Sequence, residues 1–203
     1  NGFGLTETSS VSTFLPDEYA ELRPETVGFT APPVEVDLAD VDPVSGVGEL
    51  LIRGQNVVAG YWNKPDKTAE TFIDGWIKTG DLAKIDEEGF IYIVDRAKDM
   101  LIRGGENIYC VEVENALYDH PAVMDAAVIG KPHVQLGEEP LAVVHLKPGA
   151  SATSEELRHH CAQKIAAFKV PVEVLFWPET LPRNANGKIM KSDLKKQIEN
   201  PTF

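Results

Sequence analysis

Side chains that carry oxygen stand next to glycines at two places in the chain. Thr6 and Glu7 follow two glycines in the stretch Asn1–Glu7 and offer a hydroxyl group beside a carboxylate that could bind a hard cation. Asp81 follows Gly80, and such a carboxylate can accept two hydrogen bonds from a vicinal diol such as ribose. These patterns alone are weak, because Thr and Glu often cap helices and Asp is common in turns.

Three cationic side chains lie in charge-rich or turn-like stretches. The segment Asp95–Asp99 carries four charges in five residues between two apolar segments, which is a poor place for a core and a good place for a bend. Its Arg96 could pair with a neighbouring carboxylate, and its Lys98 is either a solvated side chain or a hinge residue. Lys188 follows Gly187 at a turn of the pattern Asn-x-Asn-Gly, where lysines are usually only solvated.

Three of these candidates, Asp81, Arg96 and Lys98, lie in the stretch Gly75–Ile108, which is expected to fold as strands joined by turns. The predicted strands are Trp76–Lys78, Phe90–Val94 and Met100–Ile102, and the predicted turns are Thr79–Asp81 and Asp86–Gly89. In this prediction Asp81 stands at a strand end. Gly104 and Gly105 follow a strand, where glycines indicate a bulge or a close approach of the backbone.

The flanking regions predict an α+β fold. Short strands separated by turns indicate a small barrel or curled sheet through about Val94, and the pattern then changes to mixed helices and strands. The other predicted elements are strands Val34–Leu38, Glu49–Arg53, Val123–Ile129, Leu141–Leu146 and Val172–Trp177, helices Asp66–Phe72, Glu112–His120 and Lys191–Ile198, and a capping box at Thr153–Glu156.

Composition excludes several classes of protein. The 203 residues have a net charge of −13, which argues against nucleic-acid binding because such a surface repels phosphate. No apolar run is long enough for a transmembrane segment. Two cysteines, Cys110 and Cys161, do not make a disulfide framework, so the cytoplasm is the expected location. Cys161 follows Leu157 at a helical spacing of four on an apolar face and is therefore expected in the core. His159 and His160 are adjacent on a helix and point to different sides, so they cannot share a metal.

Ordered motifs resemble those of the adenylate-forming superfamily, which includes acyl-CoA synthetases, aryl-CoA ligases, luciferases and peptide-synthetase adenylation domains. The resemblance runs from Asn1 to about Lys196, and fatty-acyl-CoA ligases are the most similar members. The matching motifs are Phe-Gly-x-Thr-Glu, Gly-Trp-x-Lys-Thr-Gly-Asp-Leu, Asp-Arg-x-Lys-Asp, Gly-Gly-Glu-Asn-Ile and Pro-x-x-x-x-Gly-Lys.

The resemblance implies a nucleotide site in the first half of the chain. Phe3, which replaces the usual tyrosine, would stack on the adenine of ATP or AMP. Thr6 would contact the phosphate and Glu7 would hold Mg²⁺. Asp81 would bind the ribose hydroxyl groups, with Arg96 sharing that task.

It also implies roles for residues further along. Lys98 would be the hinge, and Lys188 would bridge the substrate carboxylate and the α-phosphate. The hairpin at Gly104 and Gly105 would carry the pantetheine arm of coenzyme A, with Gly105 lining its path. The implied partners are ATP, coenzyme A and a small carboxylic acid, expected to be a fatty acid.

Two domains are implied. Residues 1–97 would be the β-rich, barrel-like end of a large N-terminal domain, and residues 98–203 a mobile lid with a three-stranded sheet, a hairpin and packed helices. The chain starts with Asn and contains no Gly-rich phosphate-binding loop, so we expect a C-terminal part of a larger enzyme that is inactive alone. Two alternatives stay open, a ligase that loads a carrier protein and a docking or regulatory module without turnover.

Overall fold

The computed structural model describes residues 1–185 and 187–199. The chain divides into two compact units, Asn1–Lys98 and Asp99–Phe203. Both units mix strands with helices, which confirms the predicted α+β class. None of the helices within 1–185 and 187–199 has the length and apolar content needed to cross a membrane.

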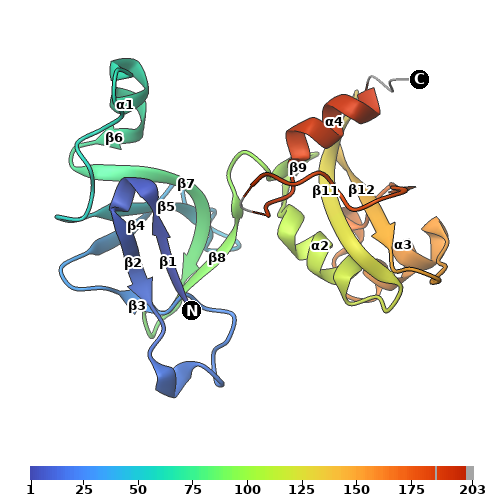
Figure 1. Cartoon of the computed structure of the whole chain (residues 1–203), viewed down its shortest axis with the longest axis horizontal. Helices are drawn as coiled ribbons and strands as arrows, with labels where there is room; N and C mark the ends of the chain where they lie inside the picture. The colour runs from blue at the N-terminus through green and yellow to red at the C-terminus, as the bar shows by residue number, and fades with distance from the viewer. Residues whose placement is uncertain (186, 200–203) are drawn as a thin grey trace. The chain divides into compact units, whose positions relative to one another are not determined.

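The first unit contains two antiparallel sheets (Figure 1). One sheet has the order β1 (Gly2–Leu5), β2 (Ser10–Phe14) and β3 (Phe29–Thr30). The other has the order β4 (Glu35–Ala39), β5 (Gly48–Arg53), β7 (Trp76–Ile85) and β6 (Phe72–Ile73), with β8 (Ile91–Arg96) also paired to β7 and the helix α1 (Pro65–Thr71) preceding β6. A 3₁₀ helix, Asp17–Tyr19, lies in the connection between β2 and β3.

Alternation along the strands builds the core of this unit. Leu50 and Ile52 of β5 are fully buried and pack with Ile77 of β7, because every second side chain of a strand points to the same face. The predicted strands Val34–Leu38 and Glu49–Arg53 and the predicted short helix are confirmed to within one residue at each end.

The predicted turn at Thr79–Asp81 is wrong, because β7 continues through it. Gly80 takes a positive φ of 72°, and the register between β5 and β7 shifts between Glu49 and Leu51. A left-handed glycine at such a shift makes a β-bulge, which adds residues to the strand without reversing it: Thr79–Asp81 of β7 stand opposite Leu50 alone. Asp81 therefore lies inside a strand of ten residues, not at a strand end. The predicted turn Asp86–Gly89 is confirmed by a Gly89 N to Asp86 O hydrogen bond of 3.0 Å.

The second unit is built on one mixed sheet. Its order is β10 (Glu106–Ile108), β9 (Leu101–Arg103), β12 (Gly137–Leu146) and β11 (Val123–His133), with β13 (Glu173–Phe176) parallel to β12. The helices are α2 (Cys110–Tyr118), α3 (Ser154–Ala162) and α4 (Lys191–Glu199), and a 3₁₀ helix spans Ala167–Lys169. The predicted pairing of the strands at Val123–Ile129 and Leu141–Leu146 is confirmed, as is the capping box at Thr153 and Glu156.

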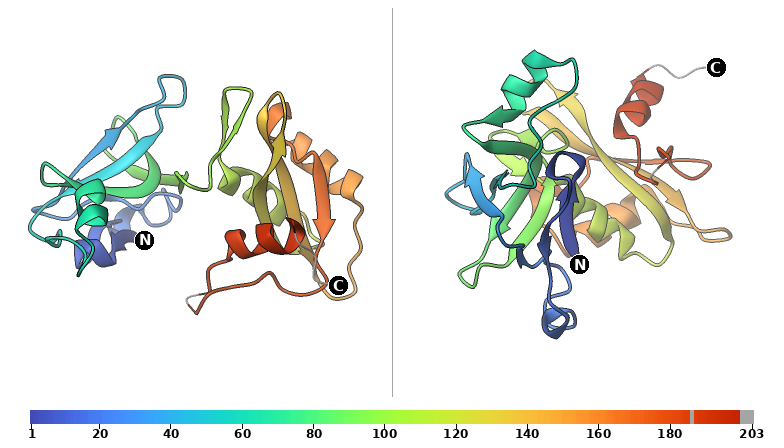
Figure 2. Two further views of the ribbon diagram at one scale, coloured as in Figure 1. Left: turned by 90° about the horizontal axis from the view of Figure 1, so that it is seen from above. Right: turned by 60° about the vertical axis from the view of Figure 1, so that its left-hand side comes forward.

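Both faces of this sheet are covered. Ala126 and Val128 of β11 point into a cluster shared with α2 and α3. Ala127 and Ile129 point to the opposite face, where they pack with Leu194 of α4. The β11–β12 pair thus separates α4 from α2 and α3 (Figure 2).

Candidate functional site

A tight connection between β1 and β2 presents Thr6 and Glu7. The buried Thr8 hydroxyl group accepts a hydrogen bond of 2.9 Å from Leu5 N and fixes the 3₁₀ helix Thr6–Thr8. Gly4 is required next to it, because a Cβ atom there would lie 2.0 Å from the carbonyl oxygen of Ser10. This close approach holds the two polar side chains at the end of the β1–β2 pair.

An open pocket of about 630 Å³ lies along this connection. Its lining includes Phe3, the exposed Thr6 and the backbone of Gly2 and Gly4. The half-buried Phe3 ring also packs against the core of the second sheet of this unit. The pocket therefore offers an aromatic surface, a hydroxyl group and approachable backbone.

Glu7 is held by a residue that sequence reasoning missed. The Tyr61 hydroxyl group donates a hydrogen bond of 2.7 Å to Glu7 Oε1, and Val58 N donates one of 2.9 Å to Glu7 O. Burial and the contact with this carboxylate raise the pKa of Tyr61 above its ordinary value. The motif Gly60-Tyr-Trp62 was the available signal, but its spacing suggests no chemistry.

Glu7 fits a magnesium ion better than a metal held by protein alone. Among residues 1–185 and 187–199 no group of three or more His, Cys, Asp or Glu side chains could hold a metal. Mg²⁺ commonly uses one or two carboxylates and takes its other ligands from water and substrate phosphates. The hydrogen bond from Tyr61 occupies Oε1, so the carboxylate is oriented and its second oxygen can serve a cation.

Asp81 and Arg96, to which the resemblance assigns one task, lie next to each other. They are opposite each other on β7 and β8, and Arg96 Nε lies 3.2 Å from Asp81 Oδ1. Asp81 is almost fully buried, whereas the Arg96 side chain is 43% exposed. The bulge at Gly80 supports the pair, because Thr79 Oγ1 bonds to Leu50 O at 2.7 Å and accepts from Asp81 N at 3.1 Å.

Lys98 is exposed in a turn at the end of the first unit. On one side of it, Ala97 N donates a hydrogen bond of 2.9 Å to Gly80 O. On the other side, Cys110 Sγ donates one of 2.9 Å to Asp99 O. Each neighbour is thus tied within its own unit.

The Gly104–Gly105 pair forms the turn between β9 and β10. Both glycines have positive φ values, 61° and 93°, which side-chain-bearing residues rarely adopt. Gly104 N donates a hydrogen bond of 2.8 Å to Leu136 O. A Cβ atom on Gly105 would meet nothing within 4 Å, so the space beside this glycine is open.

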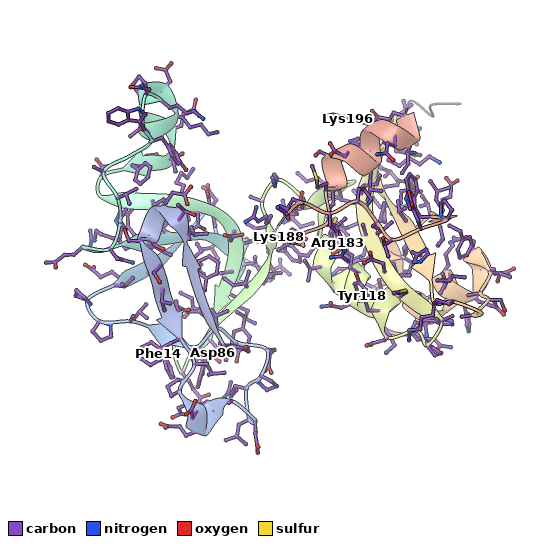
Figure 3. The ribbon with its side chains drawn as sticks, viewed as in Figure 1. Phe14, Asp86, Tyr118, Arg183, Lys188 and Lys196 are labelled. Atoms are coloured by element: carbon purple, nitrogen blue, oxygen red, sulfur yellow. The ribbon has the colours of Figure 1, made fainter. Side chains whose placement is uncertain are left out.

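Lys188 lies on a turn that is closed by its own backbone. Asn184 N donates to Lys188 O at 2.9 Å, and Lys188 N donates to Asn184 Oδ1 at 3.0 Å. Gly187 has a φ of 80°, which confirms the predicted left-handed conformation, while Asn186 of the same motif lies outside the described residues. The Lys188 side chain is exposed and is found beside Arg183 (Figure 3).

Cys161 and His160, which the sequence did not place in the site, contribute to packing in the second unit. Cys161 is fully buried, and burial raises the pKa of its thiol to about 11, so it stays neutral in the core as predicted. His160 contacts the His120 ring edge to face at 5.1 Å, and burial lowers the pKa of His160.

Two family models match the chain. The model of the AMP-binding enzyme matches residues 1–62, and that of the AMP-binding enzyme C-terminal domain matches residues 112–188. A 2-succinylbenzoate–CoA ligase of Bacillus cytotoxicus is 40% identical over 200 residues, 97% of this chain and 41% of that protein. A mitochondrial medium-chain acyl-CoA ligase of Rattus norvegicus is 42% identical over 205 residues, 97% of this chain and 33% of that protein.

A solved structure is similar over nearly the whole chain. It is the o-succinylbenzoate coenzyme A synthetase of Bacillus subtilis in complex with ATP and a magnesium ion. The TM-score is 0.87 at 35% identity, covering 96% of this chain and 40% of that chain. The present chain thus spans less than half the length of each of these three relatives.

Proposed function

Because the chain belongs to the AMP-forming adenylate-forming superfamily, we propose that it is part of a longer acid–CoA ligase, called the complete enzyme below. This enzyme joins a carboxylic acid to ATP, giving acyl-AMP and pyrophosphate, and then transfers the acyl group to coenzyme A. The observation that carries the proposal is the ordered set of Phe3–Glu7, Asp81 with Arg96, and Lys188, in which each position offers the chemistry its step needs.

The first unit supplies nucleotide contacts. Phe3 stacks on the adenine ring, since its half-buried ring lines the open pocket. Thr6 donates to a phosphate oxygen from the exposed end of the β1–β2 connection. Asp81 accepts hydrogen bonds from the ribose hydroxyl groups, and Arg96 pairs with this buried carboxylate.

Glu7 is the residue that would hold Mg²⁺. The ion supplies positive charge to the phosphate oxygens when ATP is bound. The Bacillus subtilis relative was solved with ATP and magnesium, which supports this assignment. Tyr61 orients Glu7 for that task through the hydrogen bond to Oε1.

The second unit supplies groups for both steps. Lys188 brings positive charge to the reacting oxygens while acyl-AMP forms, and this kind of charge stabilisation is a large term in catalysis. In the thioester step Lys188 has withdrawn by rotation about Lys98, and the pantetheine arm passes the open space beside Gly105.

The acid is proposed only as a class. One relative acts on 2-succinylbenzoate and another on medium-chain acyl groups, and the two are similarly identical to this chain. The fatty acid expected from the sequence remains the finer proposal. A panel of aromatic and aliphatic acids, assayed with coenzyme A and with a phosphopantetheinylated carrier protein, tests the acid and the acceptor together.

Replacement of Lys188 tests the two-step assignment. Lys188→Ala in the complete enzyme should slow acyl-AMP formation about 10²–10³-fold, measured as exchange of pyrophosphate into ATP. The same variant should still make thioester from pre-made acyl-AMP. Lys196→Ala is the matched control, because Lys196 is an exposed lysine of the same unit with 76% of its side chain accessible. Equal loss of both steps in Lys188→Ala would contradict the proposal.

A further inference from the structure

A buried carboxylate with several partners lies beneath the Lys188 turn. The Asp125 side chain, on β11, is only 5% exposed. Its Oδ1 accepts hydrogen bonds from the Tyr118 hydroxyl group at 2.8 Å and from Arg183 Nη2 at 2.6 Å, and Oδ2 accepts from Leu181 N at 3.3 Å. None of these residues takes part in the function proposed above.

Arg183 connects this carboxylate to the turn itself. While Nη2 bonds to Asp125, Nη1 donates a hydrogen bond of 2.6 Å to the carbonyl oxygen of Gly187. That carbonyl belongs to the peptide bond that leads into Lys188. The guanidinium group therefore ties the backbone next to Lys188 to the sheet, in a geometry that needs two parallel donors.

A second ion pair holds the other side of the turn. Lys191, the first residue of α4, places Nζ 2.7 Å from Glu114 Oε1, and both side chains are less than a fifth exposed. Glu114 Oε1 also accepts a hydrogen bond of 2.8 Å from Val128 N. Glu114 and Tyr118 are four residues apart on α2 and so face the same way, along the outer edge of β11.

Apolar packing already holds this segment on the sheet. Leu181 and Leu194 are buried in the same cluster as Ala127 and Ile129, and Ile189 packs against it. A buried ion pair is weak support for stability, because its desolvation offsets most of the attraction. In some proteins such pairs instead fix a defined register, and here that register would concern the backbone on both sides of Lys188.

We propose that Asp125 and Glu114 are positioning residues, which fix the Lys188 turn through Arg183 and Lys191. The inference rests on the proposed role of Lys188 and adds the groups that aim it. With the backbone fixed on both sides, the position of the Lys188 ammonium group depends only on its own side-chain rotamers. A loss of the clamp would displace this group, and a shift of about 1 Å can cost on the order of 10²-fold in rate.

The test uses the complete enzyme and two variants that separate position from stability. Arg183→Gln removes the bridge but leaves Asp125 buried without its cation. Arg183→Gln combined with Asp125→Asn removes both charges, so the second variant should recover melting temperature. Lys164→Gln is the control, because it breaks the 2.7 Å pair of Lys164 with Asp119, an exposed pair in the same unit.

Both Arg183 variants should slow acyl-AMP formation about 10- to 100-fold in kcat, with the KM for ATP and the thioester step from pre-made acyl-AMP unchanged. Amide hydrogen exchange at Gly187 and Lys188 should accelerate in both variants. Lys164→Gln should change neither the rate of acyl-AMP formation nor the hydrogen exchange at Gly187 and Lys188. If the double variant recovers the rate together with its melting temperature, the two residues only stabilise the fold, and the inference is overturned.

Hydrogen exchange keeps this inference distinct from the proposed function. Unchanged exchange at Lys188 in Arg183→Gln would overturn the clamp whatever the kinetics show. Accelerated exchange with an unchanged rate, in an enzyme that Lys188→Ala disables, would overturn the positioning role alone. If Lys188→Ala leaves acyl-AMP formation intact, the proposed function falls and the positioning role falls with it.

Discussion

The hydroxyl group of Tyr61 donates a hydrogen bond of 2.7 Å to Glu7 Oε1, although 54 positions separate the two residues. Tyr61 is itself fixed, since its backbone N–H donates to Thr68 Oγ1 at 2.9 Å and its ring contacts Phe72 edge to face. The Glu7 carboxylate is therefore oriented by a tyrosine whose own backbone and ring are held in place. A ligand held in this way binds a cation without a further loss of rotamer freedom.

This contact predicts that Tyr61→Phe needs more Mg²⁺ for acyl-AMP formation than the wild-type enzyme does. The variant keeps the ring and loses the donor, so the Mg²⁺ concentration that gives half-maximal acyl-AMP formation should rise about 10-fold, as for other partners of metal ligands. Tyr92→Phe is the matched control, because its hydroxyl group bonds to Asp86 at 3.1 Å in the same unit. An equal rise in both variants would contradict a role specific to Glu7. Calorimetric titration of the ATP complex with Mn²⁺ gives a second readout that does not depend on turnover.

Asp81→Asn should weaken nucleotide binding. The side chain keeps its shape but loses the charge that strengthens hydrogen bonds to the ribose hydroxyl groups, so AMP affinity should fall about 10- to 100-fold. Titration calorimetry with AMP on the complete enzyme measures this. Asp37→Asn provides the comparison, because Asp37 is an exposed aspartate of β4 and the net charge changes equally. An AMP affinity that stays at the wild-type value would remove Asp81 from the nucleotide site.

Gly105→Leu should block only the second half-reaction. A side chain there would enter the space that is open beside the glycine and obstruct the pantetheine arm, while acyl-AMP formation continues. The positive φ of 93° adds conformational strain, so Gly149→Leu is the control, with a φ of 77° and equally open space. Both variants should melt at similar temperatures. Normal thioester formation in Gly105→Leu would exclude this path for coenzyme A.

Cys161 predicts a loss of stability in alkaline solution. Burial raises the pKa of its thiol from 9.0 to about 11, so the unfolded state loses its proton at lower pH than the folded state. This contribution to the free energy of unfolding is fully present below pH 9, falls as pH rises towards 11, and amounts to about 3 kcal/mol. Denaturant unfolding at several pH values, compared with Cys161→Ala, measures it. The variant should show a flatter dependence between pH 9 and 11, and equal slopes would contradict the assignment.

Local sequence signals predicted most of the elements because they act over a few residues. The capping box at Thr153 and the apolar spacing before Cys161 give α3 and its buried face directly. The Thr79–Asp81 stretch misled for an equally local reason. Thr-Gly-Asp is a good turn sequence, and only pairing with β5 and β8 on either side converts its left-handed glycine into a bulge.

The missed site residues depend on contacts across the fold. Tyr61 reaches Glu7, and Arg183 reaches Asp125 over 58 positions, through side-chain contacts between distant segments that no local pattern encodes. Asp81 and Arg96 could be paired in advance only by resemblance. Their opposition follows from the β7–β8 register, which a bulge shifts between Leu82 and Ala83.

The anchoring around Lys98 limits the freedom of any reorientation. The Ala97 N–H is bonded to Gly80 and the Asp99 carbonyl group to Cys110, each inside its own unit, so the backbone between the two anchored atoms is that of three residues, Ala97, Lys98 and Asp99. A link this short allows rotation about a few torsion angles and no independent diffusion of the two units. The proposed rotation about Lys98 would therefore depend on few torsion angles, and we expect its rate to respond to backbone restriction at this position. Lys98→Pro fixes φ at this position. It should slow the overall reaction, in which the enzyme passes from acyl-AMP formation to thioester formation, more than it slows either half-reaction measured alone.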